Sequence, residues 1–415
     1  MGGVSMEWKE VRLGDVCEIK HGFAYKGKYF SDTPTCDILV TPGNFTLSGG
    51  FKLDKPKFYN GPVEKDYILS KGDLIVTMTD LSKNIDTLGY SALVPEVKGL
   101  TFHHNQRIGL VENIANNVDK YFLYWIMRTP AYQSFIATHS SGTTVHHTSP
   151  KGIGNYVFKL PPLDDQRRIA SILSSLDRKI ELNNKINADL EEMAQAIFKN
   201  WFVDFEPFKD GKFVDSELGM IPEGWKVGRL TDVFKLMPGG TPKTSEPLYW
   251  DNGTIPFFSP KDVNGVYCFA TEKHITEAGL NKCSSNLYPK DTIFITCRGT
   301  VGKVCLVACD MAMNQSNYAI KAIDGYSQYY VFFLVKSVVE RLIKKSNGAV
   351  FSAITSKDFD EEILIPSQKA VEDFTNVIDG FFRRIFAIGT ENSRLSLLRD
   401  TLLPRLMSGE LEVPE

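Results

Sequence analysis

Two long stretches of the chain place apolar residues at alternating steps of four and three. The first runs from Ile169 to Trp201 and the second from Phe374 to Leu406. An apolar seam kept up over about five heptads is typical of helices that pack along their length. The sequence therefore predicts a two-helix coiled coil within one chain. The predicted seam residues are Ile169, Leu173, Leu176, Ile180, Asn187, Leu190 and Ile197 in the first helix, and Phe374, Ile378, Phe381, Ile385, Asn392, Leu395 and Leu402 in the second.

Asn187 and Asn392 interrupt the apolar seam at equivalent places. A buried Asn at such a position can fix the register of two helices at some cost in stability. The alternative, an Asn tolerated where the seam loosens, stays open from the sequence.

The segments before the two helices resemble each other in the same order. Trp8-Lys9 matches Trp225-Lys226, and further along Asn105-Gln106 matches Asn314-Gln315. An ordered series of such matches indicates an internal duplication.

Each copy carries short β-type runs, such as Leu74–Met78 and Ile293–Thr296, broken by turn residues. Helical patterns follow at about 119–138 and 327–346. Short strands mixed with helices predict an α/β or α+β domain in each copy.

The predicted domain organisation has five segments. Antiparallel pairing of the helices lets each globular domain sit at one end, which gives a dumbbell with a pseudo-twofold axis and a rod of roughly 50–60 Å. We exclude the residues before Met6 from the fold. The segments are a first globular domain over 6–160, a central helix over 161–206, a linker over 207–221, a second globular domain over 222–366 and a C-terminal helix over 367–413.

Composition narrows the class of protein. The formal net charge is −3, so a DNA-binding surface would need folding that gathers cations on one face. Seven cysteines without a Cys-x-x-Cys pair predict reduced thiols and no metal site. No apolar run is long enough to span a bilayer, and no secretory signal opens the chain, so we expect a cytoplasmic protein without membrane partners.

Several motifs resemble those of specificity subunits of type I restriction-modification enzymes, in the family's order of domain, helix, domain, helix. The first copy departs from the pattern at Met78-Thr79-Asp80-Leu81 and at Lys20-His21-Gly22, where the family has an Arg-Gly-Thr turn and a double glycine. The motifs that carry the resemblance are Leu160-Pro161-Pro162-Leu163-Asp164-Asp165-Gln166-Arg167-Arg168-Ile169-Ala170, Ile221-Pro222-Glu223-Gly224-Trp225, Gly239-Gly240-Thr241-Pro242, Arg298-Gly299-Thr300-Val301-Gly302-Lys303 and Leu403-Pro404-Arg405-Leu406-Met407-Ser408-Gly409-Glu410-Leu411.

The resemblance implies a noncatalytic subunit that carries two methyltransferase (modification) subunits onto double-stranded DNA and joins restriction/translocase subunits. Each globular domain would be a target-recognition domain that reads one half of a bipartite, asymmetric site. The coiled coil would set the gap and dock the methyltransferases. The resemblance also implies methylation of adenine N6 with S-adenosylmethionine held by the partner, and hence no cofactor on this chain.

Candidate DNA-binding residues are polar or cationic residues on predicted loops, because phosphate contacts supply affinity and base edges supply choice. Arg298 suits bidentate reading of guanine. The candidates are Lys26, Lys28, Lys83, Asn84, His146, His147 and Lys151 in the first copy, and Lys243, Lys261, Arg298, Lys303 and Lys357 in the second.

Two kinds of paired polar residues need a separate interpretation. Asn105-Gln106 and Asn314-Gln315 could bind adenine, but two half-sites need not share a base, so a structural role is favoured. The pairs His103-His104 and His146-His147 are interpreted as turn or loop residues rather than metal ligands, because neighbours on a strand point to opposite faces.

Catalysis finds no support in the sequence. The chain has no Asp/Asn-Pro-Pro-aromatic motif of amino-methyltransferases and no glycine-rich nucleotide loop, so no catalytic residue is predicted. The alternative to DNA recognition is a coiled-coil scaffold whose end domains bind proteins, without sequence-specific DNA binding.

Overall fold

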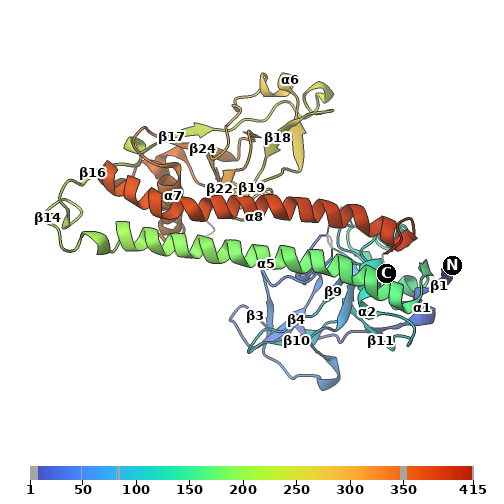
Figure 1. Cartoon of the computed structure of the whole chain (residues 1–415). Helices are drawn as coiled ribbons and strands as arrows, with labels where there is room; N and C mark the ends of the chain where they lie inside the picture. The colour runs from blue at the N-terminus through green and yellow to red at the C-terminus, as the bar shows by residue number, and fades with distance from the viewer. Residues whose placement is uncertain (1–7, 48, 81, 83–84, 346–352, 414–415) are drawn as a thin grey trace, which may run out of the picture. The chain divides into compact units, whose positions relative to one another are not determined.

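The computed structural model describes residues 8–47, 49–80, 82, 85–345 and 353–413 (Figure 1). Its contacts divide the chain into two compact units. Unit 1 comprises Met1–Arg178 and Ser396–Glu415, and unit 2 comprises Lys179–Leu395. The candidates Lys83 and Asn84 lie outside the described residues, as does the segment before Met6.

Two long helices contribute to both units: α5 (Leu163–Phe202) and α8 (Gln368–Ser408). In unit 2, the later part of α5 lies beside the first part of α8 (Figure 1). The rings of Phe198 and Phe374 are 5.9 Å apart, while Asn183 contacts Asn392 closer to the other end of α8. The helices therefore run antiparallel there, as predicted.

Unit 1 contains the complementary helical portions. Ile169 and Leu173 of α5 are buried in one apolar core with Leu403 and Leu406 of α8. Further along α5, Asp177 contacts Arg399, which lies earlier on α8 than Leu403, so the helices run antiparallel in unit 1 as well.

A polar contact interrupts the helix pair of unit 2. The amide of Asn183, which is fully buried, donates to Asn392 Oδ1 and to Glu391 Oε2, each at 2.8 Å. Asn392 in turn donates to Asn184 Oδ1 at 2.8 Å. Asn187 makes no such bond; its buried Oδ1 has no hydrogen-bond partner among the described residues. The partner of Asn392 is therefore Asn183, one turn before the asparagine that the sequence pattern singles out.

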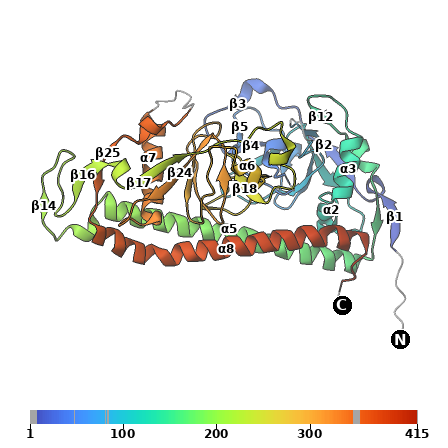
Figure 2. The same cartoon turned by 90° about the horizontal axis from the view of Figure 1, so that it is seen from above.

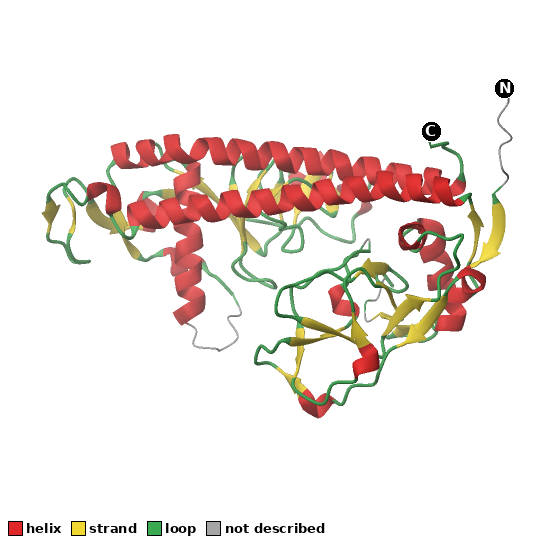
Figure 3. Cartoon of the chain, turned by 60° about the horizontal axis from the view of Figure 1, so that its bottom comes forward, coloured by secondary structure: helices red, strands yellow, loops and turns green. Residues whose placement is uncertain are grey.

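The globular part of unit 1 is built mainly of short strands with short helices at its edges (Figure 3). Its elements are β1 (Lys9–Arg12), α1 (Leu13–Val16), β2 (Glu18–His21), η1 (Gly27–Tyr29), β3 (Phe30–Ser31), β4 (Asp37–Val40), η2 (Pro42–Asn44), β5 (Lys57–Tyr59), η3 (Lys65–Tyr67), β6 (Ile68–Leu69), β7 (Leu74–Thr77), β8 (Thr79–Asp80), β9 (Ser91–Leu93), β10 (Thr101–His104), β11 (Ile108–Glu112), α2 (Lys120–Ile126), α3 (Pro130–Thr138), β12 (His146–His147), α4 (Pro150–Gly154) and β13 (Val157–Leu160).

The globular part of unit 2 uses the same kinds of element (Figure 2). They are η4 (Glu206–Phe208), β14 (Phe213–Val214), β15 (Ile221–Pro222), β16 (Lys226–Arg229), η5 (Leu230–Asp232), β17 (Phe234–Pro238), η6 (Pro247–Tyr249), β18 (Ile255–Phe258), β19 (Tyr267–Cys268), β20 (Lys273–Ile275), α6 (Glu277–Leu280), β21 (Ile293–Thr296), β22 (Val304–Val307), β23 (Ala312–Met313), β24 (Asn317–Ala322), α7 (Gln328–Lys345), η7 (Ser356–Phe359) and β25 (Glu362–Ile365).

Strand pairing repeats between the units. An antiparallel pair closes each globular part, β1 with β13 and β16 with β25. The order β2-β11-β7-β9 of unit 1 corresponds to β17-β24-β21-β22 of unit 2, and the parallel pair β4·β10 corresponds to β18·β23. The mixed fold and its internal repeat are therefore confirmed.

The helical pattern over 119–138 is not one helix. It forms α2 and α3, whereas the equivalent pattern in unit 2 forms the single helix α7. Pro130 causes the break, because proline has no N–H for the preceding turn and disfavours helical backbone at the residue before it. Thr129 is extended and caps α3 through a bond from the backbone N–H of Tyr132.

The assignment of His103-His104 to a turn or loop is wrong. Both lie on β10 with fully buried side chains. His103 Nε2 contacts Asp37 Oδ1 at 2.6 Å, while His104 Nε2 donates to the carbonyl of Ile108 at 2.7 Å. Neighbouring strand residues face opposite sides, so the two rings belong to two different packing layers. His146 and His147 also lie on a strand, the short β12.

We expect His104 to make the stability of unit 1 depend on pH. Burial lowers the pKa of His104 to about 4, although its bond to Ile108 opposes the shift. An unfolded histidine has a pKa near 6.5, so the folded state binds fewer protons and stability falls as pH drops through 6.5 toward 4. At pH 5 the loss is about 2 kcal/mol.

Urea unfolding at pH 7 and pH 5 checks this expectation. His104→Gln should reduce the difference between the two midpoints, whereas His21→Gln, which replaces an exposed histidine, should leave it unchanged. An undiminished difference in the His104 variant would assign the pH dependence to other groups.

Among the described residues, no helix is both long enough and apolar enough to cross a membrane.

Candidate nucleic-acid interface

A turn between two strands recurs in both units. In unit 1 it joins β10 to β11 and contains Asn105, whose Oδ1 accepts the backbone N–H of Arg107 at 3.1 Å. In unit 2 it joins β23 to β24, and Asn314 Oδ1 accepts the backbone N–H of Ser316 at 3.0 Å. The asparagine side chains therefore stabilise the turns through hydrogen bonds to the backbone of the turn itself.

The backbone of each turn packs closely against a glycine, Gly22 after β2 in unit 1 and Gly239 after β17 in unit 2. A Cβ at Gly22 would lie 2.1 Å from the carbonyl oxygen of Asn105, and a Cβ at Gly239 would lie 2.0 Å from that of Asn314. These distances leave no room for a side chain at either glycine. The same glycine–asparagine contact is therefore present in both units.

Two further loops are anchored to the turn in unit 1. The N–H of Phe23 donates to His104 O at 2.9 Å, and the N–H of Met78 donates to Arg107 O at 2.9 Å. Thr148 then donates to Met78 O at 3.0 Å. Three loops, which follow Gly22, β7 and Ser141, therefore meet around one turn.

Unit 2 repeats these anchors. Gly240 donates to Met313 O at 3.1 Å, Cys297 to Ser316 O at 2.8 Å and Ile354 to Cys297 O at 3.0 Å. We call each arrangement of turn and loops a loop face. The unit 1 loop face contains residues 22–29, 78–88, 105–107 and 141–151, and the unit 2 loop face contains residues 239–246, 297–303, 314–316 and 353–357, in both cases as far as they are described.

The loop face of unit 1 gathers the described candidates of the first copy. Lys26 is exposed next to η1, and Lys28 is exposed with its Nζ 4.8 Å from the ring centre of Tyr29. His146 and His147 pair with Asp80 and Thr79 through β12 and β8. Lys151 is exposed in α4, which Ser149 caps.

The loop face of unit 2 gathers four candidates of the second copy. Lys243, Arg298, Lys303 and Lys357 are all exposed. Lys261 is also exposed, but it follows β18 outside the loop face, with its Nζ 3.9 Å from Glu272 Oε2.

Equivalent candidates occupy equivalent places. Lys357 lies in η7 after the capping residue Thr355, as Lys151 lies in α4 after Ser149. Each lysine is therefore the second residue of a short helical segment, although α4 is an α-helix and η7 is a 3-10 helix.

Asp80 organises the loop that follows β8 in unit 1. Its buried carboxylate accepts backbone N–H groups of Ser82, Thr87 and Leu88 at 2.6 to 3.0 Å. Burial alone would raise the pKa of Asp80, but the hydrogen bonds from Ser82 and Thr87 hold it below its usual value. Asp80 therefore stays charged, and its hydrogen bonds fix the backbone of the loop around it. Sequence reasoning noted its departure from the family pattern but not this role.

Exposed polar residues of the loop faces that were not among the DNA-binding candidates include Gln106 and Arg107 in unit 1 and Gln315 in unit 2. The match of Asn105-Gln106 to Asn314-Gln315 could have pointed to the glutamines, but the sequence alone does not separate the role of the asparagine from that of the glutamine. The structure separates a structural asparagine from an exposed glutamine in both copies.

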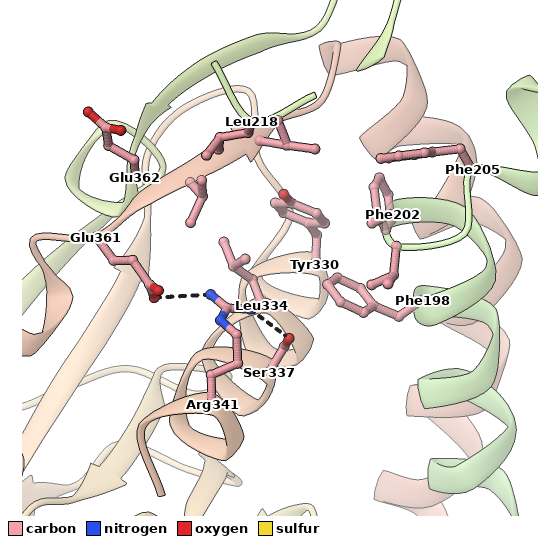
Figure 4. A pocket seen from close by; sticks show the side chains of 13 residues that line it. Phe198, Phe202, Phe205, Leu218, Tyr330, Leu334, Ser337, Arg341, Glu361 and Glu362 are labelled. Atoms are coloured by element: carbon pink, nitrogen blue, oxygen red, sulfur yellow. Dashed lines mark hydrogen bonds and ion pairs between the residues drawn. The ribbon is translucent and has the colours of Figure 1, made fainter. Parts of the chain in front are cut away.

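A cavity of about 400 Å³ opens elsewhere in unit 2, between α5, α7 and β25 (Figure 4). Aromatic side chains, among them Phe198, Phe202 and Tyr330, form one side, and the ion pair of Arg341 with Glu361, at 3.0 Å, forms another. Its lining includes none of the predicted DNA-binding residues.

The described residues also show no group of three or more His, Cys, Asp or Glu side chains that could hold a metal ion.

Taken together, the geometry defines a class: a duplicated α/β protein with two equivalent, cation-bearing loop faces and antiparallel helical segments. The chain belongs to the family of the type I restriction modification DNA specificity domain, whose model matches residues 6–192 and 222–381.

Relatives that align with most of the chain are also named type I specificity subunits. The HindI specificity subunit of Haemophilus influenzae is 28% identical over 98% of this chain and 100% of its own length. The MjaIX specificity subunit of Methanocaldococcus jannaschii is 29% identical over 71% of this chain and 69% of its own length. The S subunit of the type I restriction-modification system from M. genitalium has a similar fold in its crystal structure, with a TM-score of 0.55 at 13% identity over 98% of this chain and 97% of that one. The chain is a sequence-specific DNA recognition subunit of a type I restriction-modification system.

Proposed function

We propose that each loop face reads one half of a bipartite, asymmetric DNA site. The observation that carries this proposal is that one anchored framework is built twice with different side chains on it. The first face presents His146, His147 and Arg107, whereas the second presents Arg298 and Ser316. Because base edges are distinguished by the donors and acceptors that meet them, different side chains on one framework would select different bases.

The rest of the predicted organisation belongs to the same proposal. The two readers are residues 6–160 and 222–366. The linker 207–221 joins the central helix to the second reader, and the helices over 161–206 and 367–413 set the gap between the half-sites. The helices also dock two modification subunits, which hold S-adenosylmethionine and methylate adenine. This chain contributes no catalytic residue, and restriction/translocase subunits complete the assembly in the cytoplasm.

Methylation mapping tests the proposal. The chain would be co-expressed with the modification subunit of its own system, and methylated adenines would be mapped across the host genome. A single split motif with a fixed gap is the expected result. Scattered methylation, or none in a complex that assembles, would favour the scaffold alternative, in which the end domains bind proteins.

Removing Lys151 or Lys357 should weaken DNA binding without changing the motif. Both are exposed and equivalently placed, so each is suited to a phosphate contact. Loss of one such contact lowers affinity about equally for cognate and unrelated duplexes and reduces the slope of log K against log salt by about 1. Titrations of Lys151→Ala and Lys357→Ala complexes at several salt concentrations measure both quantities.

Lys369→Ala is the matched control, because Lys369 is an exposed lysine on α8 that belongs to neither loop face. An unchanged salt slope in the Lys151 and Lys357 variants would remove these two lysines from the interface.

A further inference from the structure

We propose that Lys57 in unit 1 and Lys273 in unit 2 bind backbone phosphates of the DNA that the loop faces read. This inference rests on the proposed function. It adds to each unit a contact that lies beside its loop face and that the candidate set does not contain. Because every nucleotide carries a phosphate, these contacts would add affinity at both half-sites without choosing a base.

The two lysines occupy the same place in the sheets of the two units. Lys57 on β5 pairs with Leu39 on β4, and Lys273 on β20 pairs with Phe257 on β18, in both cases antiparallel. The row then continues to β10 and β23, at the residue two positions before the turn asparagine in each unit. The two lysines are therefore equivalent by strand register.

An aromatic ring lies against each lysine. Lys57 Nζ is 4.7 Å from the ring centre of Phe30, and Lys273 Nζ is 5.7 Å from that of Trp250. Phe30 and Trp250 are also equivalent, because each directly follows the 3-10 helix, η1 or η6, that precedes the first strand of the row. The cation and the ring therefore both recur, although the segment between them has a different length in each unit.

The charge of each lysine is available to a ligand. Lys57 and Lys273 are exposed, and neither forms an ion pair within the described part of the chain. Glu272, the neighbour of Lys273, lies instead near Lys261 at 3.9 Å. An aromatic ring attracts an ammonium group without neutralising its charge. A phosphate would therefore meet a cation that is positioned but not compensated.

Both lysines lie beside the loop faces. Trp250 Nε1 donates to the carbonyl of Lys243 at 3.1 Å, and Trp250 and Lys273 line one hollow with Thr244, so they adjoin the unit 2 loop face. In unit 1, Phe30 directly follows the first segment of the loop face. Because phosphates border the groove in which base edges are read, a cation at the border of a loop face suits a backbone contact.

Another lysine shows that duplication alone does not preserve such a pair. Lys290 Nζ lies 3.7 Å from the ring centre of Phe386 on α8. Its counterpart is Lys71, which precedes β7 as Lys290 precedes β21 but pairs with Glu96 at 2.6 Å. The lysine–aromatic pair beside the loop faces is kept in both units, which favours a role that both half-sites require.

The experiment combines a neutral lysine variant with a neutral phosphate. The complex with the modification subunit is assembled with the Lys57→Met or the Lys273→Met chain, since methionine keeps an unbranched side chain and removes the charge. Its affinity is measured for the mapped site and for duplexes in which one phosphate at a time is replaced by an uncharged methylphosphonate. Methylation mapping checks the motif, and thermal unfolding verifies that each variant folds.

We expect each variant to lower the slope of log K against log salt by about 1, so that its loss of affinity grows about three- to fourfold between about 200 and 50 mM salt. The motif should stay the same. On the duplex that lacks the charge of the contacted phosphate, the variant should bind as the unchanged complex does. At all other positions the full loss should remain. The two contacted phosphates should lie at equivalent positions, counted from the methylated base of each half-site.

Lys290→Met is the matched control. It also removes a lysine that lies over an aromatic ring, but Lys290 belongs to neither loop face and contacts α8. The control complex should have the salt slope of the unchanged complex and the same response to each methylphosphonate.

Equal losses at every phosphate position would overturn the proposal, as would no loss on any duplex, because the lysine would then have no phosphate partner. A changed motif would also overturn it, since a phosphate contact carries no choice of base. The proposed function fails in a different way, through a complex of the unchanged chain that does not distinguish the mapped site from unrelated DNA. Normal discrimination without coupling between lysine and phosphate would overturn this inference alone.

Discussion

Replacing residues 6–160 with the corresponding segment of a relative that has a different target should change one half of the methylated motif and leave the other half intact. The physical reason is that the loop face of unit 1 is held by contacts within its own globular part, as in the bonds from Phe23 to His104 and from Met78 to Arg107. A transplanted segment therefore carries its own framework. Methylation mapping of cells that express the exchanged chain with its modification subunit reads out both halves at once.

The reciprocal exchange of residues 222–366 is the matched control and should change only the other half-site. Both exchanges should keep the gap between the halves, because the predicted spacer helices are untouched. A change in both halves after either exchange would contradict modular reading. A change in the gap alone would place the determinant of spacing inside a globular part.

The helical part of the fold could be predicted because its signal is periodic. Ile169 and Leu173 in α5 and Phe374 and Ile378 in α8 are buried, and connectivity favoured the antiparallel arrangement found in each unit. Seam residues nearer the middle of the helices, such as Leu176 and Ile180, are only partly buried. The heptad pattern predicts which face of a helix packs against its partner, but it does not predict how much of each side chain is buried.

The polar contact of the helix pair was harder to predict. The pattern selected Asn187 because it matches Asn392 in the repeat, but two antiparallel helices bring residues together in reversed order. The hydrogen-bond partner of Asn392 is consequently Asn183 and not Asn187. Matching by sequence shift identifies equivalent positions, not contacts.

The candidate interface could be predicted only in outline. Lysines on expected loops, such as Lys151 and Lys357, could be selected from the sequence because a cation suits a phosphate contact. The hydrogen bonds that join those loops involve backbone groups, so the amino-acid sequence does not indicate them. The role of Asp80 depends on three backbone N–H groups that only the folded loop presents. Such contacts form only when the folded loop brings these groups together.

Asp177→Ala should be among the most destabilising single substitutions in unit 1. The carboxylate of Asp177, on α5, contacts Arg128 Nη1 at 2.8 Å and Arg399 Nη1, on α8, at 2.6 Å. Both guanidinium groups are nearly buried, with side chains 3% and 12% exposed. Burial alone would lower the pKa of Arg399, but contact with Asp177 raises it above its usual value. Losing the shared carboxylate removes the charge that lies between two nearly buried cations and leaves Arg399 with Asp400 alone, which costs about 3 kcal/mol.

Urea unfolding of the variant, followed by tryptophan fluorescence, measures this loss. Asp373→Ala is the matched control, since it removes an exposed carboxylate paired with Lys369 on α8 and should leave the midpoint unchanged. Adding Arg399→Leu to Asp177→Ala should cost less than Arg399→Leu alone, because the second change then removes a destabilising charge. Additive costs in this cycle would mean that the two side chains are not coupled. The burial of three charged groups where α5 and α8 meet would then have to be explained by packing of their aliphatic portions.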